Sequence, residues 1–330
     1  MRMNASKVSV IGAGLVGSST AFSLLTQGVC DEILLVDINQ ERAHGEMMDL
    51  RDGIDYLGRN VKVSVGDYKD CGDADIVVIT AGPPPKEGQT RLDSLDLSKK
   101  IIDSLVGPIM DAGFSGVFLI ISNPVDIIAQ YVWKLSGLPK NQVLGTGTAL
   151  DSARLKALIG ELVGIDPRSV HAYALGEHGD SQTVPWSRVT VGGKTFAEVL
   201  RDNPGRFEGV DLDKLVHDTV KAGWEILRRK GTTYYGIATT ATGIIKCILH
   251  DENRIIPVST RGRIRRTRRF LRRAGHHRTQ RRQGDCPSPF DRAGTGKIPR
   301  FHRCDPQLCQ GFVKIALLKA WMYDLFPTRC

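Results

Sequence analysis

The chain has 330 residues, 41% of them hydrophobic, which is enough for a sizeable core and, at ~100–200 residues per domain, for two domains. No apolar run approaches the ~20 residues that span a bilayer, and the first residues lead into a strand without a signal-peptide pattern, so we expect a cytoplasmic protein. A net charge of +9 raises the question of a nucleic-acid or membrane surface as partner.

The positive charge is concentrated at one end of the sequence. Residues 261–330 contain 18 Lys and Arg against 4 Asp and Glu, a net charge of +14, whereas residues 1–260 contain 27 against 32, a net charge of −5. The body is therefore mildly acidic. The seven cysteines lack the paired spacing of metal ligands, so we expect reduced thiols and no metal site.

A glycine-rich turn near the N-terminus predicts a dinucleotide site. The β-branched run 7–11 leads into a Gly-x-Gly-x-x-Gly turn over 12–17, and a helical pattern follows. Gly12 permits the tight turn, Gly14 lets backbone N–H groups approach a pyrophosphate, and Gly17 lets helix and strand pack closely. The alternative is a chance glycine turn.

The position after the second predicted strand favours NAD. The apolar run 33–36 ends in Asp37, twenty residues after Gly17. A carboxylate at this spacing accepts hydrogen bonds from the ribose hydroxyls of NAD and repels the extra phosphate of NADP.

Three further strands are predicted over 61–65, 75–80 and 117–122, with helical segments between them. Apolar strands that alternate with helices are typical of an α/β fold, here a Rossmann doubly wound parallel sheet covered on both faces. Such folds bind ligands at the carboxyl ends of the strands.

Two residues near these strand ends are candidate ligand contacts. Residues 81–91 contain three prolines and two glycines, so they form a long loop, and Arg91 at its end is placed to close over a substrate. The alternative for Arg91 is a solvated loop cation. Asn123, after the fifth strand, can offer its amide to the nicotinamide or the substrate.

The second half of the chain is predicted to form an α+β domain. We place the boundary after residue 146, which gives a dinucleotide-binding domain over 1–146 and a substrate domain over 147–260. Within the latter we predict strands, turns and an irregular connection over 182–209, helices over 211–230 and from the Gly231 region through Cys247, and a strand over 255–259.

The segment from 151 to 181 contains three groups whose chemistry fits together. Asp151 and Arg154 lie three apart in a helical pattern, so they share one helix face, and a guanidinium fork grips a substrate carboxylate by two hydrogen bonds. His178, between glycines, can give or take a proton near pH 7. If Asp151 accepts the other ring N–H, it fixes the tautomer. The alternative is a helical ion pair and an unrelated loop histidine.

Residues 7–260 resemble the L-lactate/malate dehydrogenase family, and within it the bacterial-type L-lactate dehydrogenases. The matching stretches are the 12–17 turn with Asp37, Gly88-Gln89-Thr90-Arg91, Ser122-Asn123-Pro124, Leu150 to Leu155, Gly176 to Ser181, and Lys230 to Ile237.

The resemblance implies roles for these residues in the conversion of pyruvate to lactate in glycolytic fermentation. His178 would donate a proton as hydride arrives from the nicotinamide, with Asp151 orienting it, while Arg154 clamps the carboxylate and Arg91 polarises the carbonyl as its loop closes. The remaining implied contacts are Asn123 and Thr233 for substrate and cofactor, Ile237 for the nicotinamide pocket, and Gly12, Gly14, Val16, Gly17 and Asp37 for NAD. A homotetramer is also implied.

Two departures from the family pattern concern specificity and regulation. Pro85 stands where lactate enzymes usually have glutamine and malate enzymes arginine, so malate is disfavoured and a bulkier apolar 2-oxo acid is an alternative substrate. Relatives activated by fructose 1,6-bisphosphate use a basic residue two after the clamp arginine and a histidine before the catalytic loop. Here those are Lys156 and His171, a partial match to an effector site.

The resemblance ends at Thr260, and residues 261–330 form a basic tail that we interpret as out of frame. The codons CGA GGG CGA ATA CGG CGT are permitted for 261–266 and, read one nucleotide later, give Glu-Gly-Glu-Tyr-Gly-Val, which is family-like. The same operation on 276–282 gives Ile-Ile-Gly-Arg-Asn-Gly-Val. We expect the missing core to weaken the substrate domain and to give an impaired or inactive product. The alternative from another class is a nucleic-acid binder with an arginine-rich arm.

Overall fold

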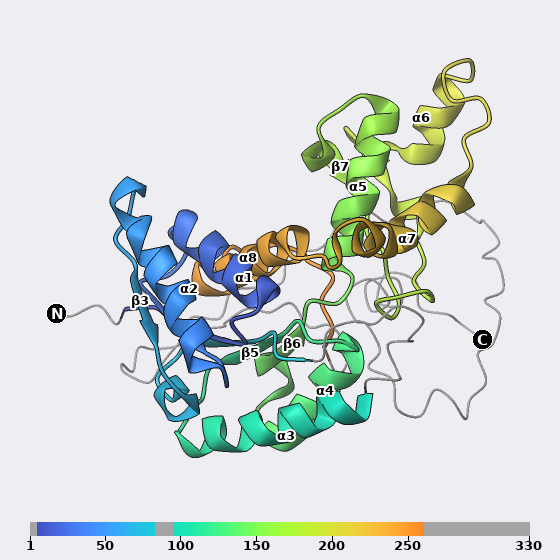
Figure 1. Ribbon diagram of the computed structural model, residues 1–330. Coiled ribbons are helices and arrows are strands. Elements are labelled where there is room, and N and C mark those ends of the chain that lie inside the picture. The colour runs from blue at the N-terminus through green and yellow to red at the C-terminus, as the bar shows by residue number, and fades with distance from the viewer. Residues whose placement is uncertain (1–4, 83–94, 261–330) are drawn as a thin grey trace, which may run out of the picture.

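The computed structural model describes residues 5–82 and 95–260 (Figure 1). The first half of the chain forms a six-stranded parallel sheet with the order β3-β2-β1-β4-β5-β6. Its strands are β1 (Lys7–Ile11), β2 (Glu32–Val36), β3 (Lys62–Val65), β4 (Ile76–Ile79), β5 (Val117–Ile120) and β6 (Val143–Gly145). The predicted doubly wound sheet is confirmed, and β6 extends it beyond the five strands predicted from sequence.

Helices cover both faces of this sheet (Figure 1). The helices are α1 (Leu15–Thr26), α2 (Gln40–Asp52), α3 (Leu95–Asp111), α4 (Val125–Ser136) and, from the end of the described chain, α8 (Tyr235–Leu249). Along β4, Ile76 and Val78 pack into the cluster under α1 and α8, while Val77 and Ile79 pack into the cluster over α3 and α4. Burial on both faces explains why these strands read as continuous apolar runs.

The order of the strands places the ligand crevice. Because β1 lies between β2 and β4, the order in which the chain adds strands reverses there. In folds of this kind the ligand crevice lies at the carboxyl ends of the strands that flank such a point, here β1 and β4. The 12–17 glycine turn leaves β1 at this point.

A second lobe has its own core. It contains α5 (Ala149–Val163), α6 (Phe196–Asp202), α7 (Leu212–Lys230) and an antiparallel sheet of β7 (Val170–His171), β8 (Thr190–Val191) and β9 (Lys194–Thr195). Fully buried Leu155 and Ile159 of α5 pack with Val170 and with Phe196 of α6. This core supports α5, the helix that carries two of the predicted site residues.

Helix α8 returns to the first lobe although it comes late in the sequence. Its buried residues Ala241, Ile244 and Ile245 join the cluster that contains Ala21 and Leu24 of α1. The two helices lie side by side over one face of the sheet (Figure 1). The turn before α8 therefore passes between the lobes.

Two sequence predictions were only partly right. The strands predicted within 182–209 are present as β8 and β9. The stretch predicted as strands, turns and an irregular connection contains helix α6, which begins with a capping box: Thr195 Oγ1 accepts from the N–H of Glu198, and Glu198 Oε2 accepts from the N–H of Thr195. The strand predicted over 255–259 is reduced to one antiparallel bridge, between Ser259 and Gly145. The other residues of 255–259 have no strand partner among the described residues, so this segment is not a regular strand.

None of the helices within the described ranges has the combined length and apolar character that a membrane crossing requires.

Candidate active site

Two of the three glycines in the turn after β1, Gly12 and Gly17, are required by the fold itself. Gly12 has a φ of +100°, which only glycine adopts readily. A Cβ on Gly17 would lie 1.7 Å from the carbonyl oxygen of Gly12, so α1 packs on the turn without room for a methyl group. A Cβ on Gly14 would meet nothing within 4 Å. Gly12 and Gly17 thus serve the fold. Gly14 leaves open space beside the N-terminus of α1, where a phosphate fits.

Asp37 is held at the same turn by backbone donors. Its Oδ2 accepts from the N–H of Ala13 at 2.6 Å, and its Oδ1 accepts from the N–H of Asn39 at 2.8 Å. These bonds orient a half-buried carboxylate beside the glycine turn. The remaining acceptor sites of this carboxylate fit the hydroxyl groups of a ribose diol, and its negative charge opposes a second phosphate.

Asp151, Arg154 and His178, which the sequence placed together only by inference, meet in one cluster. Asp151 Oδ1 accepts from Nη1 of Arg154 at 3.0 Å, and its Oδ2 lies 2.6 Å from Nδ1 of His178. The Asp151 side chain is 2% exposed, against 15% for Arg154 and 17% for His178. The carboxylate is therefore buried behind the other two groups, which reach toward solvent.

This arrangement assigns the histidine tautomer. An ionised carboxylate only accepts, so Nδ1 of His178 carries a hydrogen and donates it to Asp151. Asp151 lies in the first turn of α5, where the helix dipole favours a negative charge. Across from it, a Cβ on Gly223 of α7 would come within 3.5 Å of the Arg154 guanidinium, so α7 backs the arginine closely.

The backbone of the histidine loop is anchored by a residue that sequence reasoning missed. The N–H of His178 donates to Oδ2 of Asp126 at 2.9 Å, and the hydroxyl of Ser259 donates to Oδ1 of the same carboxylate. Asp126 is 3% exposed. The sequence signal was weak: an acidic residue in the first turn of a helix does not name a partner 52 residues away.

The other predicted contacts lie around the crevice. Asn123 ends the segment after β5, with an exposed side chain and a carbonyl that accepts from Ser98. Thr233 is half-buried in the turn between α7 and α8. Val16 and Ile237, each in the first two turns of its helix, pack against the same core cluster. Arg91 and Pro85 fall outside the described residues.

Lys156 and His171 sit on the second lobe, away from the glycine turn. Nζ of Lys156 lies 5.3 Å from the centroid of the Tyr173 ring, and burial, followed by the charge of Arg254, lowers the pKa of its ammonium group. His171 is exposed in β7. A half-buried cation next to a second cation is a setting in which a bound anion would be favourable.

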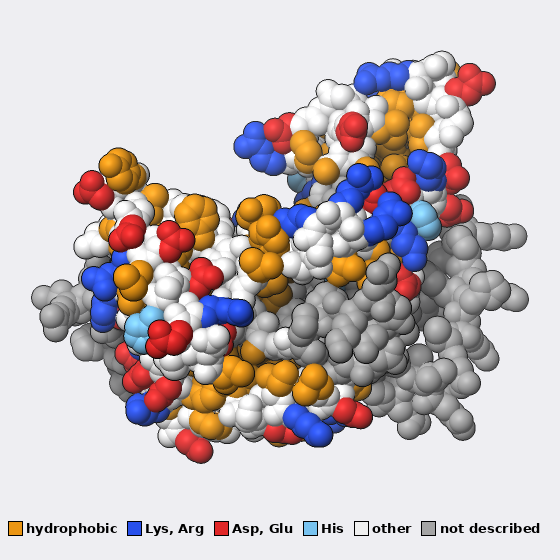
Figure 2. Space-filling model, in the orientation of Figure 1, with side chains coloured by type: hydrophobic (Ala, Val, Ile, Leu, Met, Phe, Trp, Pro, Cys, Tyr) orange, Lys and Arg blue, Asp and Glu red, His pale blue; other side chains and the backbone are white. Residues whose placement is uncertain are grey.

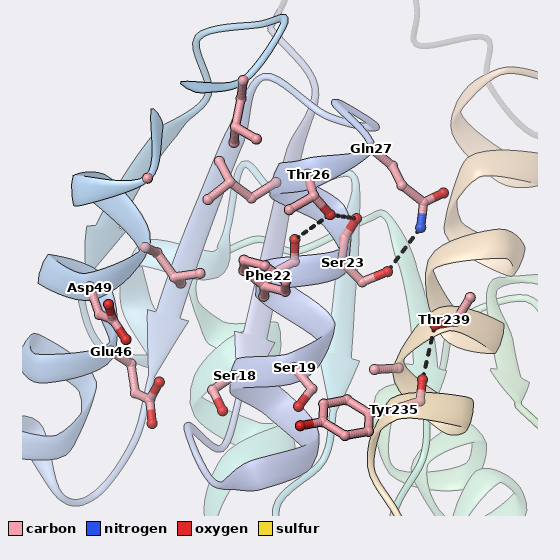
Figure 3. Close-up of a pocket in the computed structure, with 15 residues that line it drawn as sticks. Ser18, Ser19, Phe22, Ser23, Thr26, Gln27, Glu46, Asp49, Tyr235 and Thr239 are labelled. Atoms are coloured by element: carbon pink, nitrogen blue, oxygen red, sulfur yellow. Dashed lines mark hydrogen bonds between the residues drawn. The ribbon is translucent and has the colours of Figure 1, made fainter. Parts of the chain in front are cut away.

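The concavity in Figure 3 is a groove between α1, α2 and α8, with a volume of about 640 Å³. Ser19 of α1 lies next to Tyr235 of α8, Phe22 lies further along α1, and Glu46 and Asp49 of α2 close the other side (Figure 3). Asp151, Arg154 and His178, the triad of the second lobe, do not line it. Figure 2 shows hydrophobic side chains gathered over α1 and α8, where Leu15, Phe22 and Tyr235 are 58%, 59% and 67% exposed.

The cysteines among the described residues, Cys30, Cys71 and Cys247, are free thiols. Burial raises the pKa of Cys30 to about 12 and that of Cys71 to about 11, so both are poor nucleophiles. Within 5–82 and 95–260, no three His, Cys, Asp or Glu side chains are grouped so as to hold a metal ion.

Comparison with known families gives two matches in chain order. Residues 6–145 match the family model for the NAD binding domain of lactate/malate dehydrogenase, and residues 148–264 match that for its alpha/beta C-terminal domain. "L-lactate dehydrogenase 3" of Bacillus anthracis is 56% identical over 259 residues, which are 78% of this chain and 82% of that protein. "L-lactate dehydrogenase 1" of Bifidobacterium longum is 50% identical over 258 residues, with the same two coverages.

Solved structures give the same result. The minor L-lactate dehydrogenase from Enterococcus mundtii, in its ligands-bound form, superposes with a TM-score of 0.75 at 45% identity, covering 78% of this chain and 82% of that one. A lactate dehydrogenase from a Medee basin deep-sea metagenome library has the same TM-score and coverages at 46% identity.

Proposed function

The chain belongs to the lactate/malate dehydrogenase family, and from this premise we propose that it is an NAD-dependent L-lactate dehydrogenase. The observation that carries the proposal is the buried Asp151 carboxylate held between Arg154 and His178. That arrangement offers a carboxylate clamp and a proton donor side by side, which are the two groups that reduction of a 2-oxo acid requires.

We assign the cofactor to the crevice at β1. The 12–17 turn would hold the pyrophosphate, with Gly14 leaving space for it and Val16 beside it, and Asp37 would accept the ribose hydroxyls. Asn123 and Ile237 would contact the nicotinamide end. When bound, the reduced nicotinamide supplies the hydride.

We assign the proton transfer to His178. Because Nδ1 donates to Asp151, Nε2 is the ring atom that gives its proton to the keto oxygen of pyruvate. The carboxylate of Asp151 stabilises the imidazolium before transfer and fixes the direction in which Nε2 points. Loss of the proton leaves a neutral ring that still donates from Nδ1, so the reverse reaction can use the same histidine as a base.

Substrate binding is assigned to Arg154, aided by Thr233. The guanidinium is held by Asp151 on one side and backed by Gly223 on the other, so its remaining N–H groups form a fixed fork for the substrate carboxylate. Arg91 would polarise the carbonyl, and Pro85 would face the substrate side chain. A proline offers no counter-ion for a second carboxylate, which favours pyruvate over oxaloacetate.

The experiment is a scan of 2-oxo acids with the purified full chain and NADH, followed by the loss of NADH absorbance. We expect turnover with pyruvate and little with oxaloacetate. Because Pro85 replaces a larger polar residue, the second candidate is a 2-hydroxyacid dehydrogenase for branched 2-oxo acids. Higher kcat/KM for a branched acid than for pyruvate would establish that candidate. A chain that turns over none of the acids and also fails to bind NADH would refute both, because an enzyme impaired only by its tail keeps the cofactor site of the first lobe.

We propose a homotetramer acting in the cytoplasm in glycolytic fermentation. The groove of Figure 3 and the exposed Phe22 and Tyr235 support contact with a further copy of the chain, since apolar patches of this kind mark interfaces. Lys156 and His171 would bind fructose 1,6-bisphosphate, and the nearby charge of Arg254 supports an anion beside Lys156. Sedimentation with and without this effector tests both assignments.

We propose domain limits of 1–146 and 147–260, and an out-of-frame tail over 261–330 that impairs the enzyme. In support, the match to the C-terminal family model ends at residue 264, close to where the sequence departs. Sequencing the gene tests the reading frame. If the codons for 261–330, read one nucleotide later, do not encode a family-like sequence, a frame slip is excluded. The rival nucleic-acid arm predicts salt-dependent binding by the chain, and lack of binding eliminates it.

A further inference from the structure

Asp126 is the one buried carboxylate that bonds the catalytic loop from outside the Asp151 cluster among the described residues. We infer that Asp126 is a positioning residue for His178 and that Ser259 fixes Asp126 in turn, so that a hydrogen-bonded relay joins the segment after α8 to the proton donor. The inference rests on the proposed function, because it assigns His178 that role.

The relay fixes the end of His178 that Asp151 does not reach. Asp151 holds the ring through Nδ1 at 2.6 Å, while Asp126 holds the backbone N–H at 2.9 Å. Gly176 and Gly179 on either side have φ values of +111° and +147°, so the loop has no side-chain restriction of its own at these points. A ring held at one end still swings with its backbone. Both anchors are therefore needed to fix Nε2.

The bonding of Asp126 is not explained by its own helix. An acidic residue in the first turn of α4 is favoured by the helix dipole, and that is the simplest structural role. However, the N-cap of α4 makes no side-chain bond, and the two oxygens of Asp126 reach residues 52 and 133 positions away. A carboxylate that is 3% exposed needs such donors, since an unpaired buried charge is costly.

Ser259 packs against the segment that connects β6 to α5. It is 0% exposed, and its backbone exchanges two 2.9 Å hydrogen bonds with Gly145. A Cβ on Gly147 would lie 2.7 Å from the nitrogen of Ser259, so the chains approach as closely as glycine allows. The serine thus touches both supports of His178: Asp126 directly, and α5 with Asp151 through the 145–148 segment.

The test uses graded variants of the full chain. Asp126→Ala removes both bonds. Asp126→Asn keeps them, because its amide oxygen accepts from His178 and its NH₂ donates to the hydroxyl oxygen of Ser259. Ser259→Ala removes the hydroxyl and leaves its backbone bridge. The matched control is Asp75→Ala, since Oδ2 of Asp75 also accepts a distant backbone N–H, that of Lys7 at 2.9 Å, at the amino ends of β1 and β4.

We expect Asp126→Ala to lower kcat for pyruvate by about 100-fold, the usual cost of a small misplacement of a reacting group, while the KM for pyruvate and NADH binding are retained. Asp126→Asn should restore most of kcat, and Ser259→Ala should lose roughly threefold to tenfold, the worth of one hydrogen bond. Asp75→Ala should leave kcat unchanged. An Asn variant as impaired as Ala, or an Ala variant with full kcat, would overturn the relay.

Hydrogen exchange of the 174–184 backbone separates this inference from the proposed function. Exchange should accelerate in Asp126→Ala and in Ser259→Ala but not in Asp75→Ala, even if the parent chain reduces no 2-oxo acid. Unchanged exchange in both relay variants would sink the relay while leaving the enzyme assignment untouched. If Asp126→Ala does not fold, Ser259→Ala and Asp126→Asn give the same decision.

Discussion

The glycine turn and the proton-transfer cluster differ in how much of the chain is needed to build them. The turn, its strand and Asp37 lie within 7–37, and the bond from Ala13 to Asp37 closes the unit. The cluster needs α5, the 176–181 loop, Asp126 on α4 and Ser259 after α8. A local site depends on the conformations its own residues allow, whereas an assembled site depends on tertiary packing that any of several segments can disturb.

The strongest test of the assembled site is Asp151→Asn. The amide removes the charge and can donate to Nδ1, which favours the wrong tautomer of His178, and it weakens the hold on Arg154. We expect kcat for pyruvate to fall on the order of 10⁴-fold, measured by NADH oxidation. The control is Asp166→Asn, an exposed carboxylate bonded to Arg168, which should retain activity. Activity within a factor of a few of the parent would show that Asp151 does not orient the histidine.

The corresponding test of the local site is Asp37→Asn. The amide oxygen can still accept from Ala13, so the turn is kept, but the charge that opposes a second phosphate is lost. We expect the ratio of kcat/KM for NADH to that for NADPH to fall by about 10-fold or more, because a like-charge contact costs several kcal/mol. The exposed Asp67→Asn serves as control. An unchanged ratio would place the ribose elsewhere.

Substitutions at Gly17 and Gly14 can separate the contribution of the turn to stability from its contribution to NADH binding. Gly17→Ala would bring a methyl group against the carbonyl of Gly12, where a Cβ has only 1.7 Å, and overpacking of this kind costs about 3 kcal/mol. That predicts a fall in Tm of roughly 6–12 °C. Gly14→Ala meets nothing within 4 Å and should leave Tm unchanged while weakening NADH binding. The reverse pattern would mean that Gly14 faces no ligand.

The same contrast explains what could be predicted from sequence. Gly12, Gly14, Gly17 and Asp37 carry their reasons within a short segment, so spacing alone indicated the turn and the strand after it. Helical spacing predicted that Asp151 and Arg154 share one helix face. Their contact with His178 was a hypothesis from the chemistry of the three groups, which the resemblance strengthened, since nothing in the spacing of residues 151 and 178 brings them together.

What the sequence did not reveal depends on tertiary structure. Asp126 looks like any acidic residue at a helix start, and its two partners become visible only when three segments pack. The run 255–259 has strand-like apolar residues, yet among the residues that the structure describes only Ser259 of this run has a strand partner. Helix α6 was different: its Thr195-to-Glu198 capping signal was present in the sequence and was overlooked.

The smallest effect is expected at the Thr195 cap of α6, where a substitution should change stability and not catalysis. Thr195→Ala removes the hydroxyl that accepts from the N–H of Glu198, and loss of a cap costs about 1 kcal/mol, or roughly 2–4 °C in Tm for a protein of this size. Thr195→Ser keeps the hydroxyl and should keep Tm. Phe196 and Val199 of α6 pack in the core of the second lobe, and this core contains none of Asp151, Arg154 and His178. We therefore expect no change of kcat in either variant. A loss of kcat in Thr195→Ala with Tm intact would mean that this core, and not only the relay and Asp151, holds the histidine loop in place.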